Sequence, residues 1–299
     1  MNLDKDLITT VVGSYPTNPS EREMANSYFT HEDPYKKSLE KAVQAQLNAG
    51  IEIVSDGQTR NGMIELFVQG LRGFRVKEKF EIVSEINYKG PITIEDQRSV
   101  REILPEDSML KGIITGPWTL VKSCDNKFYD DDLTAAWDAA EALKNEAQTL
   151  SDVCDVIQLD EPLFSVDYPE QAKELVEKVL DIDKPTALHA CGDVSDIAEQ
   201  LIEFDIDILD HEFAENPGLY EVYADLEFDQ RLAVGVVTTK TPVEDVGTIQ
   251  SRIEKAANIF GTKTMIDPDC GLRNLPEKAA YEKLDNMVKA RDVVLNERN

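Results

Sequence analysis

The chain has 299 residues, of which 41% are hydrophobic, so it can bury a sizeable core, and its length is what a (β/α)8 barrel routinely needs. A balance of 58 acidic against 31 basic residues gives a net charge of −27, which argues against nucleic acid or an anionic membrane as a partner because both need a basic surface. No apolar run approaches the roughly 20 residues that span a membrane, and the acidic start MNLDKDLITT lacks a secretory pattern, so we expect a cytoplasmic protein.

Short runs of β-branched and apolar residues alternate along the chain with longer segments of helical periodicity. Continuous apolar strands that alternate with helices are typical of a parallel sheet covered on both faces. The expected strands are 8–12, 51–55, 112–115, 156–159, 186–189, 206–210, 232–237 and 264–267. The expected helices are 36–48, 133–150, 170–180, 194–203, 243–259 and 276–296. Eight strands favour an α/β fold closed into a (β/α)8 TIM barrel, and an open doubly wound sheet is the alternative.

Residues 72–110 interrupt this alternation. Polar and apolar positions alternate there, and Lys89-Gly90-Pro91 is a turn signal, so we expect a β-hairpin inserted between the second and third barrel strands. The chain has no Pro/Ser-rich linker, internal repeat or low-complexity tract. We therefore predict a single catalytic domain over 1–299.

Polar residues follow nearly every expected strand, and active sites of (β/α)8 barrels lie at the C-terminal ends of the strands. Any one such cluster could be an ordinary turn of Gly, Pro and Asp, but their recurrence favours a functional face. The clusters are 13–16, 56–61, 115–118, 160–162, 189–193, 210–213, 238–240 and 267–271.

Four residues in these clusters form a candidate metal site: His189, Cys191, Glu212 and Cys270. Residues two apart on a strand point the same way, so His189 and Cys191 can share one ion, with Glu212 and Cys270 arriving from later strands. One imidazole, two thiolates and a carboxylate match the tetrahedral ligation of zinc. The alternative is a buried thiol beside a hydrogen-bonded imidazole.

Other histidine, glutamate and cysteine residues are weaker candidates for metal ligands. His211 adjoins Glu212, and neighbours on a strand face opposite sides, so only one of the two is expected to enter the site. Glu215 is a weaker rival. Cys124 and Cys154 lack comparable surroundings, and we expect both to be packing residues because four scattered cysteines form no disulfide scaffold.

Seven short motifs are spread over nearly the whole chain: VVGSYP at 11–16, RNGM at 60–63, TGP at 115–117, QLDEP at 158–162, HAC at 189–191, HEF at 211–213 and PDCGL at 268–272. With these motifs the chain resembles the catalytic C-terminal half of cobalamin-independent methionine synthase, in the short archaeal-type form that consists of that half alone. The resemblance implies a barrel and a zinc site made by the same four residues.

The resemblance also implies a homocysteine site. Gly13 and Ser14 would bind the carboxylate of the amino acid and Asp160 its ammonium group, which fits their donor and acceptor chemistry. In the family a Gly-Glu stretch near the second strand makes a further contact to the ammonium group. Here the stretch is Asp-Gly-Gln, and Gln58 takes the place of the glutamate. The plainer alternatives are turn chemistry for Ser14 and a helix cap for Asp160.

Two departures from the family concern the methyl donor. Nothing here corresponds to the N-terminal barrel that helps full-length enzymes bind methylfolate, and Lys240 stands where they carry a histidine. The departing amine of methylfolate must be protonated, which a histidine can assist, whereas a methylcorrinoid leaves as cobalt(I) and needs no proton. We therefore expect a methylcorrinoid, either methylcobalamin or a corrinoid protein, as donor, and a folate-dependent donor is the alternative.

The expected activity is a zinc-dependent methyl transfer to the thiol of homocysteine, which makes methionine. A free thiol has a pKa of about 8.5, and zinc would stabilise the thiolate that attacks the methyl carbon in line. The candidate catalytic side chains are Asp160 and Lys240. The alternatives are a methylcobamide:coenzyme M-type methyltransferase, whose sulfonated acceptor favours basic residues over Asp160, and a non-catalytic zinc protein that docks a corrinoid protein.

Overall fold

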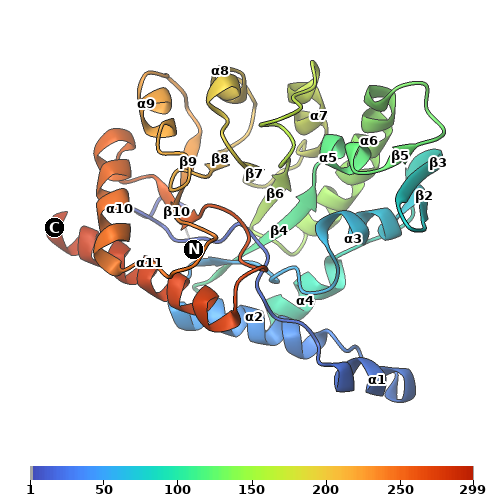
Figure 1. The fold of residues 1–299 in the computed structure, drawn as a ribbon, viewed down its shortest axis with the longest axis horizontal. Helices are drawn as coiled ribbons and strands as arrows, with labels where there is room; N and C mark the ends of the chain where they lie inside the picture. The colour runs from blue at the N-terminus through green and yellow to red at the C-terminus, as the bar shows by residue number, and fades with distance from the viewer. Residues whose placement is uncertain (1–2, 299) are drawn as a thin grey trace.

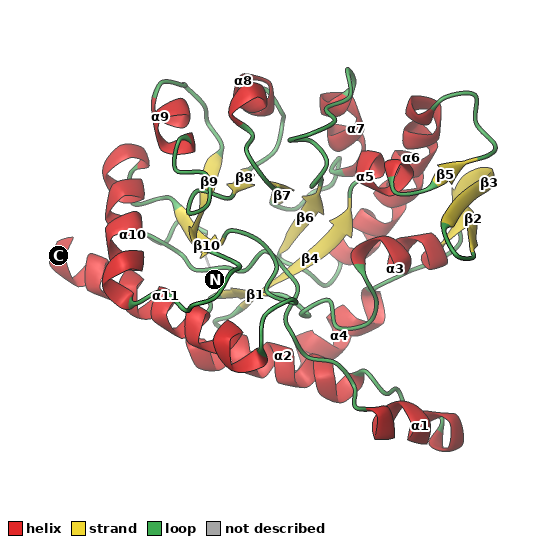
Figure 2. Ribbon diagram, viewed as in Figure 1, coloured by secondary structure: helices red, strands yellow, loops and turns green. Residues whose placement is uncertain are grey.

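A computed structural model describes residues 3–298, and residues 1–2 and 299 of the predicted domain lie outside the described residues. The central sheet is parallel and curls into a barrel with helices on its outside (Figures 1 and 2). The order of its strands is β1–β4–β6–β7–β8–β9–β10. Their bounds are β1 (Ile53–Val54), β4 (Met109–Thr115), β6 (Val156–Asp160), β7 (Thr186–Ala190), β8 (Ile208–His211), β9 (Arg231–Val237) and β10 (Met265–Pro268).

The predicted first strand, 8–12, fills the gap between β10 and β1. Thr9 forms a parallel bridge with Ile266, and Thr10 forms one with Ile53. The Thr10 N–H donates to the Ile266 carbonyl at 2.9 Å, and the Ile53 N–H donates to the Thr9 carbonyl at 3.0 Å. The segment is therefore the eighth member of the barrel, although only two isolated bridges define it, and the predicted (β/α)8 fold is confirmed.

The helices around the barrel begin and end close to where the hydrophobic periodicity places them. The longest two predicted segments, 133–150 and 276–296, correspond to α6 and α11, whereas 194–203 is divided into a short 3-10 turn and a single helical turn. The bounds are α1 (Glu21–Thr30), α2 (Lys36–Ala49), α3 (Met63–Gly70), α5 (Pro117–Lys122), α6 (Asp132–Ser151), α7 (Ala172–Val179), η1 (Ser195–Ile197), α8 (Ala198–Leu201), α9 (Leu219–Ala224), α10 (Val246–Phe260) and α11 (Glu277–Arg298). Helix α1 buries no residue and projects from the barrel (Figure 1).

The interrupted region contains a hairpin and a helix. Strands β2 (Leu71–Val76) and β3 (Phe80–Tyr88) pair antiparallel at the predicted insertion, and the short β5 (Asp125–Asn126) adds to β3. The prediction is wrong for the rest of 72–110, because α4 (Ile94–Ile103) follows the hairpin and β4 already begins at Met109. The buried residues Ile94, Gln97 and Val100 recur three apart, which is a helical spacing.

Glu146 of α6 ties the insertion to the barrel. Its buried carboxylate accepts the N–H groups of Ile92 and Thr93, each at 2.9 Å, and the hydroxyl groups of Thr93 at 3.0 Å and Tyr88 at 3.1 Å. A buried carboxylate is stable only when such donors satisfy it. The end of the hairpin and the start of α4 therefore share one anchor.

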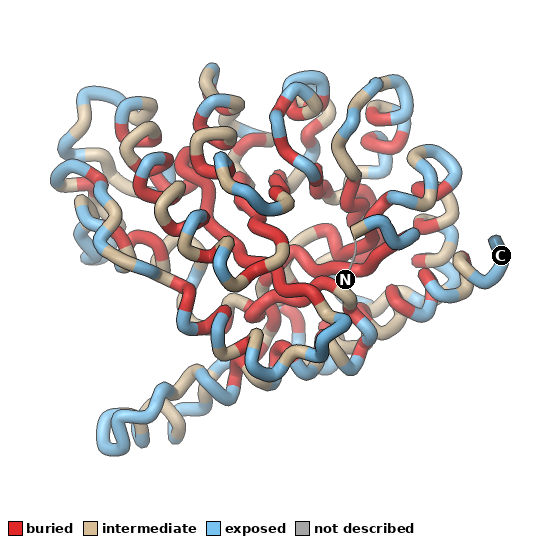
Figure 3. The backbone as a smooth tube through the Cα atoms, turned by 180° about the vertical axis from the view of Figure 1, so that it is seen from behind, coloured by how far each residue is buried: buried red, intermediate tan, exposed pale blue. Residues whose placement is uncertain are grey.

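One end of the barrel is closed by apolar side chains. Each of the eight barrel members contributes one residue to this layer, near its N-terminal end: Ile8, Ile53, Met109, Val156, Ala187, Ile208, Ala233 and Met265. The buried core continues between the sheet and the inner faces of the helices, while their outer faces are exposed (Figure 3). Polar side chains gather instead toward the C-terminal ends of the strands, where barrels hold their sites. Among the described residues, no helix combines the length and apolar character needed to cross a membrane.

Candidate metal centre and substrate pocket

His189, Cys191 and Cys270 meet at the C-terminal end of the barrel. His189 lies near the end of β7, Cys191 directly follows that strand, and Cys270 follows β10. The His189 Nε2 is 2.9 Å from the Cys191 sulfur, which is 3.3 Å from the Cys270 sulfur. The three possible ligand atoms lie within 4.8 Å of one another. The predicted i, i+2 pair thus points one way, and the third predicted ligand joins it from the far end of the chain.

Glu212 lies beside these three residues. Its carboxylate accepts a hydrogen bond from the Gly192 N–H and lies against the Cys191 side chain. Its pKa is raised, first by partial burial and then by the negative charge of Cys270. The possible ligand atoms of His189, Cys191 and Cys270 lie within 4.8 Å of one another, and this group does not include Glu212. The fourth predicted ligand is therefore next to the centre but farther from it than the other three.

The loop that carries Glu212 is held by Asp269. The Asp269 carboxylate accepts the N–H groups of Ala214 and Glu215, each at 2.9 Å. A Cβ on Gly235 would come within 2.3 Å of an Asp269 oxygen, so only glycine leaves room for this contact. Asp269, which directly precedes Cys270, therefore fixes the loop after β8 that carries Glu212.

The two thiols are electrically unequal. The hydrogen bond from Cys191 lowers the pKa of Cys270 to about 4 despite its burial, while that same bond and burial raise the pKa of Cys191. Cys270 is therefore the more acidic of the two thiols. The thiolate is the form in which cysteine binds a metal ion.

The other ring nitrogen of His189 faces a carboxylate. Nδ1 lies 3.1 Å from an Asp210 oxygen, and both side chains are buried. The positive charge of the imidazole lowers the pKa of Asp210 against the effect of burial. A carboxylate at Nδ1 leaves Nε2 to face the thiols, as in metal sites where a carboxylate orients a histidine ligand.

The rival histidine lies outside the site. His211 is fully buried, its Nδ1 is 3.2 Å from the Ala190 carbonyl, and its ring stacks on Tyr223. Burial lowers its pKa to about 4, so the ring is neutral. The expectation that His211 and Glu212 face opposite sides is confirmed.

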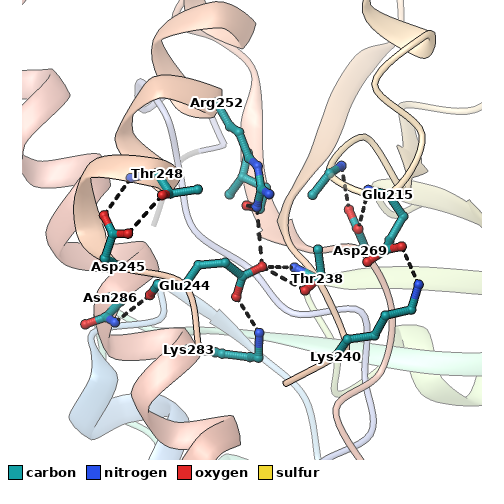
Figure 4. A network of polar contacts seen from close by, with 12 residues as sticks. Glu215, Thr238, Lys240, Glu244, Asp245, Thr248, Arg252, Asp269, Lys283 and Asn286 are labelled. Carbon is teal, nitrogen blue, oxygen red and sulfur yellow. Dashed lines mark hydrogen bonds and ion pairs between the residues drawn. The ribbon is translucent and has the colours of Figure 1, made fainter. Parts of the chain in front are cut away.

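Glu215, the second rival, is paired with Lys240. Figure 4 shows the Lys240 ammonium group turned toward the Glu215 carboxylate, beside Asp269. The Lys240 side chain is 71% exposed. In the same view Glu244 binds Thr238, Arg252 and Lys283 and thereby holds the segment after β9 against α11.

The two remaining cysteines are packing residues in the structure. Cys154 is fully buried in the apolar core, and burial raises its pKa. Cys124 bonds the Leu120 carbonyl at 3.2 Å, and burial raises its pKa to about 12.

A pocket of about 320 Å³ opens directly over the metal centre. Its lining includes His189, Cys191, Cys270 and three of the predicted substrate residues, Ser14, Gln58 and Asp160. Gly13, the fourth, is buried next to it, and a Cβ there would come within 3.2 Å of the Gln58 side chain. The structure therefore brings three of the four predicted metal residues and three of the four predicted substrate residues into the lining of one cavity, which does not include Glu212.

Asp160 is the buried carboxylate of this pocket. Gln158 donates to it at 2.7 Å and to the Val12 carbonyl at 2.9 Å, which fixes the carboxylate against the first barrel segment. Burial raises the pKa of Asp160 to about 7. Asp160 does not cap the helix that follows it, because α7 begins after Gln171. The neighbouring Glu161 instead accepts the N–H groups of Trp118 and Thr119 at the start of α5, an earlier helix.

Arg273 is a site residue that the sequence did not single out. Its guanidinium donates to the carbonyl groups of Gln58 and Asn61, and it lines the pocket. Gln58 has a φ of 45°, in the left-handed region that non-glycine residues rarely adopt, so these bonds secure an unfavourable turn. The signal in the sequence that could have identified Arg273 is its position three residues after Cys270.

The comparisons with known proteins agree with this geometry. A family model described as "Cobalamin-independent synthase, Catalytic domain" matches residues 7–292. A methionine synthase of Methanothermobacter marburgensis is 39% identical, covering 95% of this chain and 99% of its own length. One of Methanocaldococcus jannaschii is 36% identical, covering 96% and 99%. The solved structure of a B12-independent methionine synthase from Shewanella sp. W3-18-1 superposes with a TM-score of 0.83 at 22% identity, over 98% of this chain and 99% of that one, which shows the shared fold.

The family description also bears on the methyl donor. "Cobalamin-independent" conflicts with the methylcorrinoid donor, and with the corrinoid-protein partner, expected from the sequence. That expectation relied on the lack of a counterpart to the N-terminal barrel and on Lys240, which the structure places in an exposed ion pair with Glu215. Because the family model and the archaeal relatives match nearly the whole chain, the chain belongs to the family of cobalamin-independent synthase catalytic domains.

Proposed function

We propose that this protein is a methionine synthase, a methyltransferase that moves a methyl group to the thiol of homocysteine at a zinc centre. The observation that carries this proposal is the position of a His/Cys/Cys group at the floor of a pocket that also presents Asp160 and Ser14. A thiol acceptor that is also an amino acid needs a metal site for its sulfur, and charged or polar groups for its ammonium and carboxylate groups. The pocket supplies them together.

The residues present fit zinc. One imidazole nitrogen and two sulfur atoms within 4.8 Å of one another are the borderline-soft donor set that zinc prefers, and Asp210 orients the histidine as in other zinc sites. His189, Cys191 and Cys270 would hold the ion, and Glu212, the more loosely placed carboxylate, would complete the set in the absence of substrate. When bound, zinc supplies Lewis-acid stabilisation of a thiolate at neutral pH.

The protein side chains orient the acceptor. Asp160, held by Gln158, is the proposed partner of the homocysteine ammonium group, and binding of that cation favours its ionised form. Ser14 and the adjoining Gly13 N–H are the proposed donors to the substrate carboxylate. With the amino-acid end fixed at these points, the sulfur is directed toward the two cysteines, so positioning supplies much of the rate acceleration.

For the donor we propose a methylated reduced folate, or a pterin of the same chemistry, in keeping with a cobalamin-independent family. Methyl transfer from such a donor breaks a carbon–nitrogen bond, forms a carbon–sulfur bond, and leaves an amine that takes up one proton. Supplying methylfolate and methylcobalamin separately, and measuring methionine, tests this part of the proposal. Methionine formed from methylcobalamin alone would contradict it.

The central experiment is the Cys270→Ala variant. It should lose bound zinc and methionine formation together while keeping its secondary structure, because removal of one of three close ligands breaks the centre and leaves the barrel intact. Metal content, methionine yield and circular dichroism are the measurements. Cys124→Ala, which removes a thiol far from the pocket lining, is the matched control and should keep both. A Cys270→Ala protein that is zinc-free and fully active would overturn the mechanism.

A further inference from the structure

Arg273 lines the substrate pocket, and the proposed mechanism does not use it. It belongs to the segment that follows Cys270, in a turn that the Leu275 N–H closes by donating to the Leu272 carbonyl at 3.0 Å. Leu272 and Leu275 are buried in the apolar core, which anchors the turn. The Arg273 guanidinium is therefore presented to the pocket from a fixed piece of backbone.

The same segment contacts the proposed carboxylate site of the acceptor. The Leu272 N–H donates to the Ser14 carbonyl at 2.8 Å. A Cβ on Gly271 would come within 2.2 Å of the Ser14 hydroxyl oxygen, so a glycine at this position leaves room for the hydroxyl group. The residues directly after Cys270 are thus packed against one substrate residue before Arg273 reaches a second one, Gln58.

Arg273 holds the turn that carries Gln58. Its guanidinium donates to the Gln58 carbonyl and, at 3.0 Å, to the Asn61 carbonyl, because a planar fork can serve two acceptors at once. On the other side of the peptide unit, the Gln58 N–H donates to the Asp56 carboxylate at 2.9 Å. The φ of 45° at Gln58 is unfavourable for a residue with a side chain, so the turn keeps this shape only while such bonds outweigh the strain.

This backbone conformation places the Gln58 side chain in the pocket, next to Gly13. A Cβ on Gly13 would come within 3.2 Å of the Gln58 Oε1. Within residues 3–298 the carboxamide of Gln58 has no hydrogen-bond partner, so its oxygen is available to a ligand. An amide oxygen accepts hydrogen bonds from an ammonium group, and Asp160 lines the same pocket.

We propose that Arg273 is a positioning residue of the acceptor site. By holding the carbonyl groups of Gln58 and Asn61, it keeps Gln58 in the left-handed conformation and sets the Gln58 carboxamide beside Gly13, where it accepts from the ammonium group of the acceptor. Arg273 acts through this turn and not by touching the acceptor. The inference rests on the proposed function, because it takes homocysteine as the acceptor, and it is independent of the metal ion and of the methyl donor.

A double-mutant cycle in steady-state kinetics tests the proposal. Arg273→Met removes the fork and keeps an unbranched side chain, so the KM for homocysteine should rise about 10-fold or more, as for a lost hydrogen bond to a charged group, while kcat and bound zinc stay the same. Gln58→Ala should have the same effect. The double variant should match Gln58→Ala within about twofold, because Arg273 then has no carboxamide to position. Increases that multiply in the double variant would contradict the proposal, and so would an unchanged KM in Gln58→Ala.

Arg101→Met is the matched control. The Arg101 side chain also donates from two nitrogens to backbone, at the Val153 carbonyl, but it does not line the pocket. Its loss should leave the KM for homocysteine unchanged, and an increase equal to that of Arg273→Met would rule out a specific role for Arg273. If Arg273→Met does not fold, Arg273→Gln, which keeps a neutral donor, takes its place in the cycle and should raise KM in the same direction.

A second measurement needs no substrate. Amide hydrogen exchange over 56–63 should be faster in Arg273→Met than in the wild type and unchanged in Arg101→Met, because only the first variant releases the turn. Unchanged exchange in Arg273→Met would refute the positioning role whether or not methionine is made. A wild-type protein that forms no methionine, with variants that show the expected exchange, would instead refute the proposed function alone.

Discussion

At the scale of single residues, Asp160 is the side chain that we propose to bind the ammonium group of the acceptor. Asp160→Asn should raise the KM for homocysteine roughly 10- to 100-fold, since a hydrogen bond to a charged group contributes about 1.5–3 kcal/mol. The acceptor 4-mercaptobutanoate, which lacks the ammonium group, should be used equally poorly by both proteins. Steady-state kinetics with the two acceptors and with 2-mercaptoethanesulfonate measures this. An unchanged KM for homocysteine would remove Asp160 from the substrate site.

Lys240 is the other catalytic candidate from the sequence, and the structure argues against it as a proton donor. Its bond to Glu215 raises its pKa, which makes it a weaker acid. A positioned general acid contributes about 100-fold or more to the rate, so Lys240→Met should lower kcat by much less than that. Lys255→Met, which removes another ion-paired surface lysine, is the control. A loss of kcat of about 100-fold or more in Lys240→Met, with no such loss in Lys255→Met, would show that Lys240 is the general acid.

The sequence predicts the His189, Cys191 and Cys270 group better than the residues that surround it. His189 and Cys191 stand two apart at a strand end, and Cys270 follows another strand in a similar way, so local periodicity already directs them to one face. Asp210, which lies 3.1 Å from His189 Nδ1, belongs to the neighbouring strand β8. The register between β7 and β8 that brings these two residues together is contained in no local pattern.

At the scale of elements, the hairpin insertion depends on Glu146. Glu146→Gln should lower the free energy of unfolding by about 1–3 kcal/mol, because the amide replaces one acceptor oxygen by a donor that faces the Ile92 and Thr93 N–H groups. Guanidinium denaturation measures this. Glu141→Gln, on the same helix but with an exposed side chain, should change stability little. Equal stability of the two variants would show that the anchor contributes nothing.

The barrel elements could be predicted because their periodicity is long and regular, as in α10 with its buried Ile249, Ile253, Ala256 and Ala257. Two kinds of element could not. Helix α4 is short and mostly polar, and only two of its four buried residues, Ile94 and Val100, are apolar, so hydrophobic periodicity does not reveal it. Helix α1 buries no residue, so it has no apolar face for the pattern to reveal.

At the scale of the whole molecule, the charge of −27 should make stability depend on salt. Exposed acids repel one another, and salt screens charges over roughly 10 Å at 0.1 M, so Tm should rise as sodium chloride is added. We also propose that the chain unfolds as one domain, because the strands, helices and insertion share a continuous core. Calorimetry should show one transition that moves upward with salt. Two separate transitions would contradict the single domain, and a Tm independent of salt would show that the repulsion is negligible.

The proposed activity depends on an acceptor sulfur that joins two protein sulfur atoms at one metal ion. Zinc X-ray absorption on the purified protein, with and without homocysteine, measures this directly. We expect homocysteine to add one sulfur neighbour to zinc and to remove one light-atom neighbour, which we assign to Glu212. The Cys124→Ala protein should show the same change. A ligand set that stays identical when homocysteine is bound would mean that the metal is structural, and would contradict the central claim.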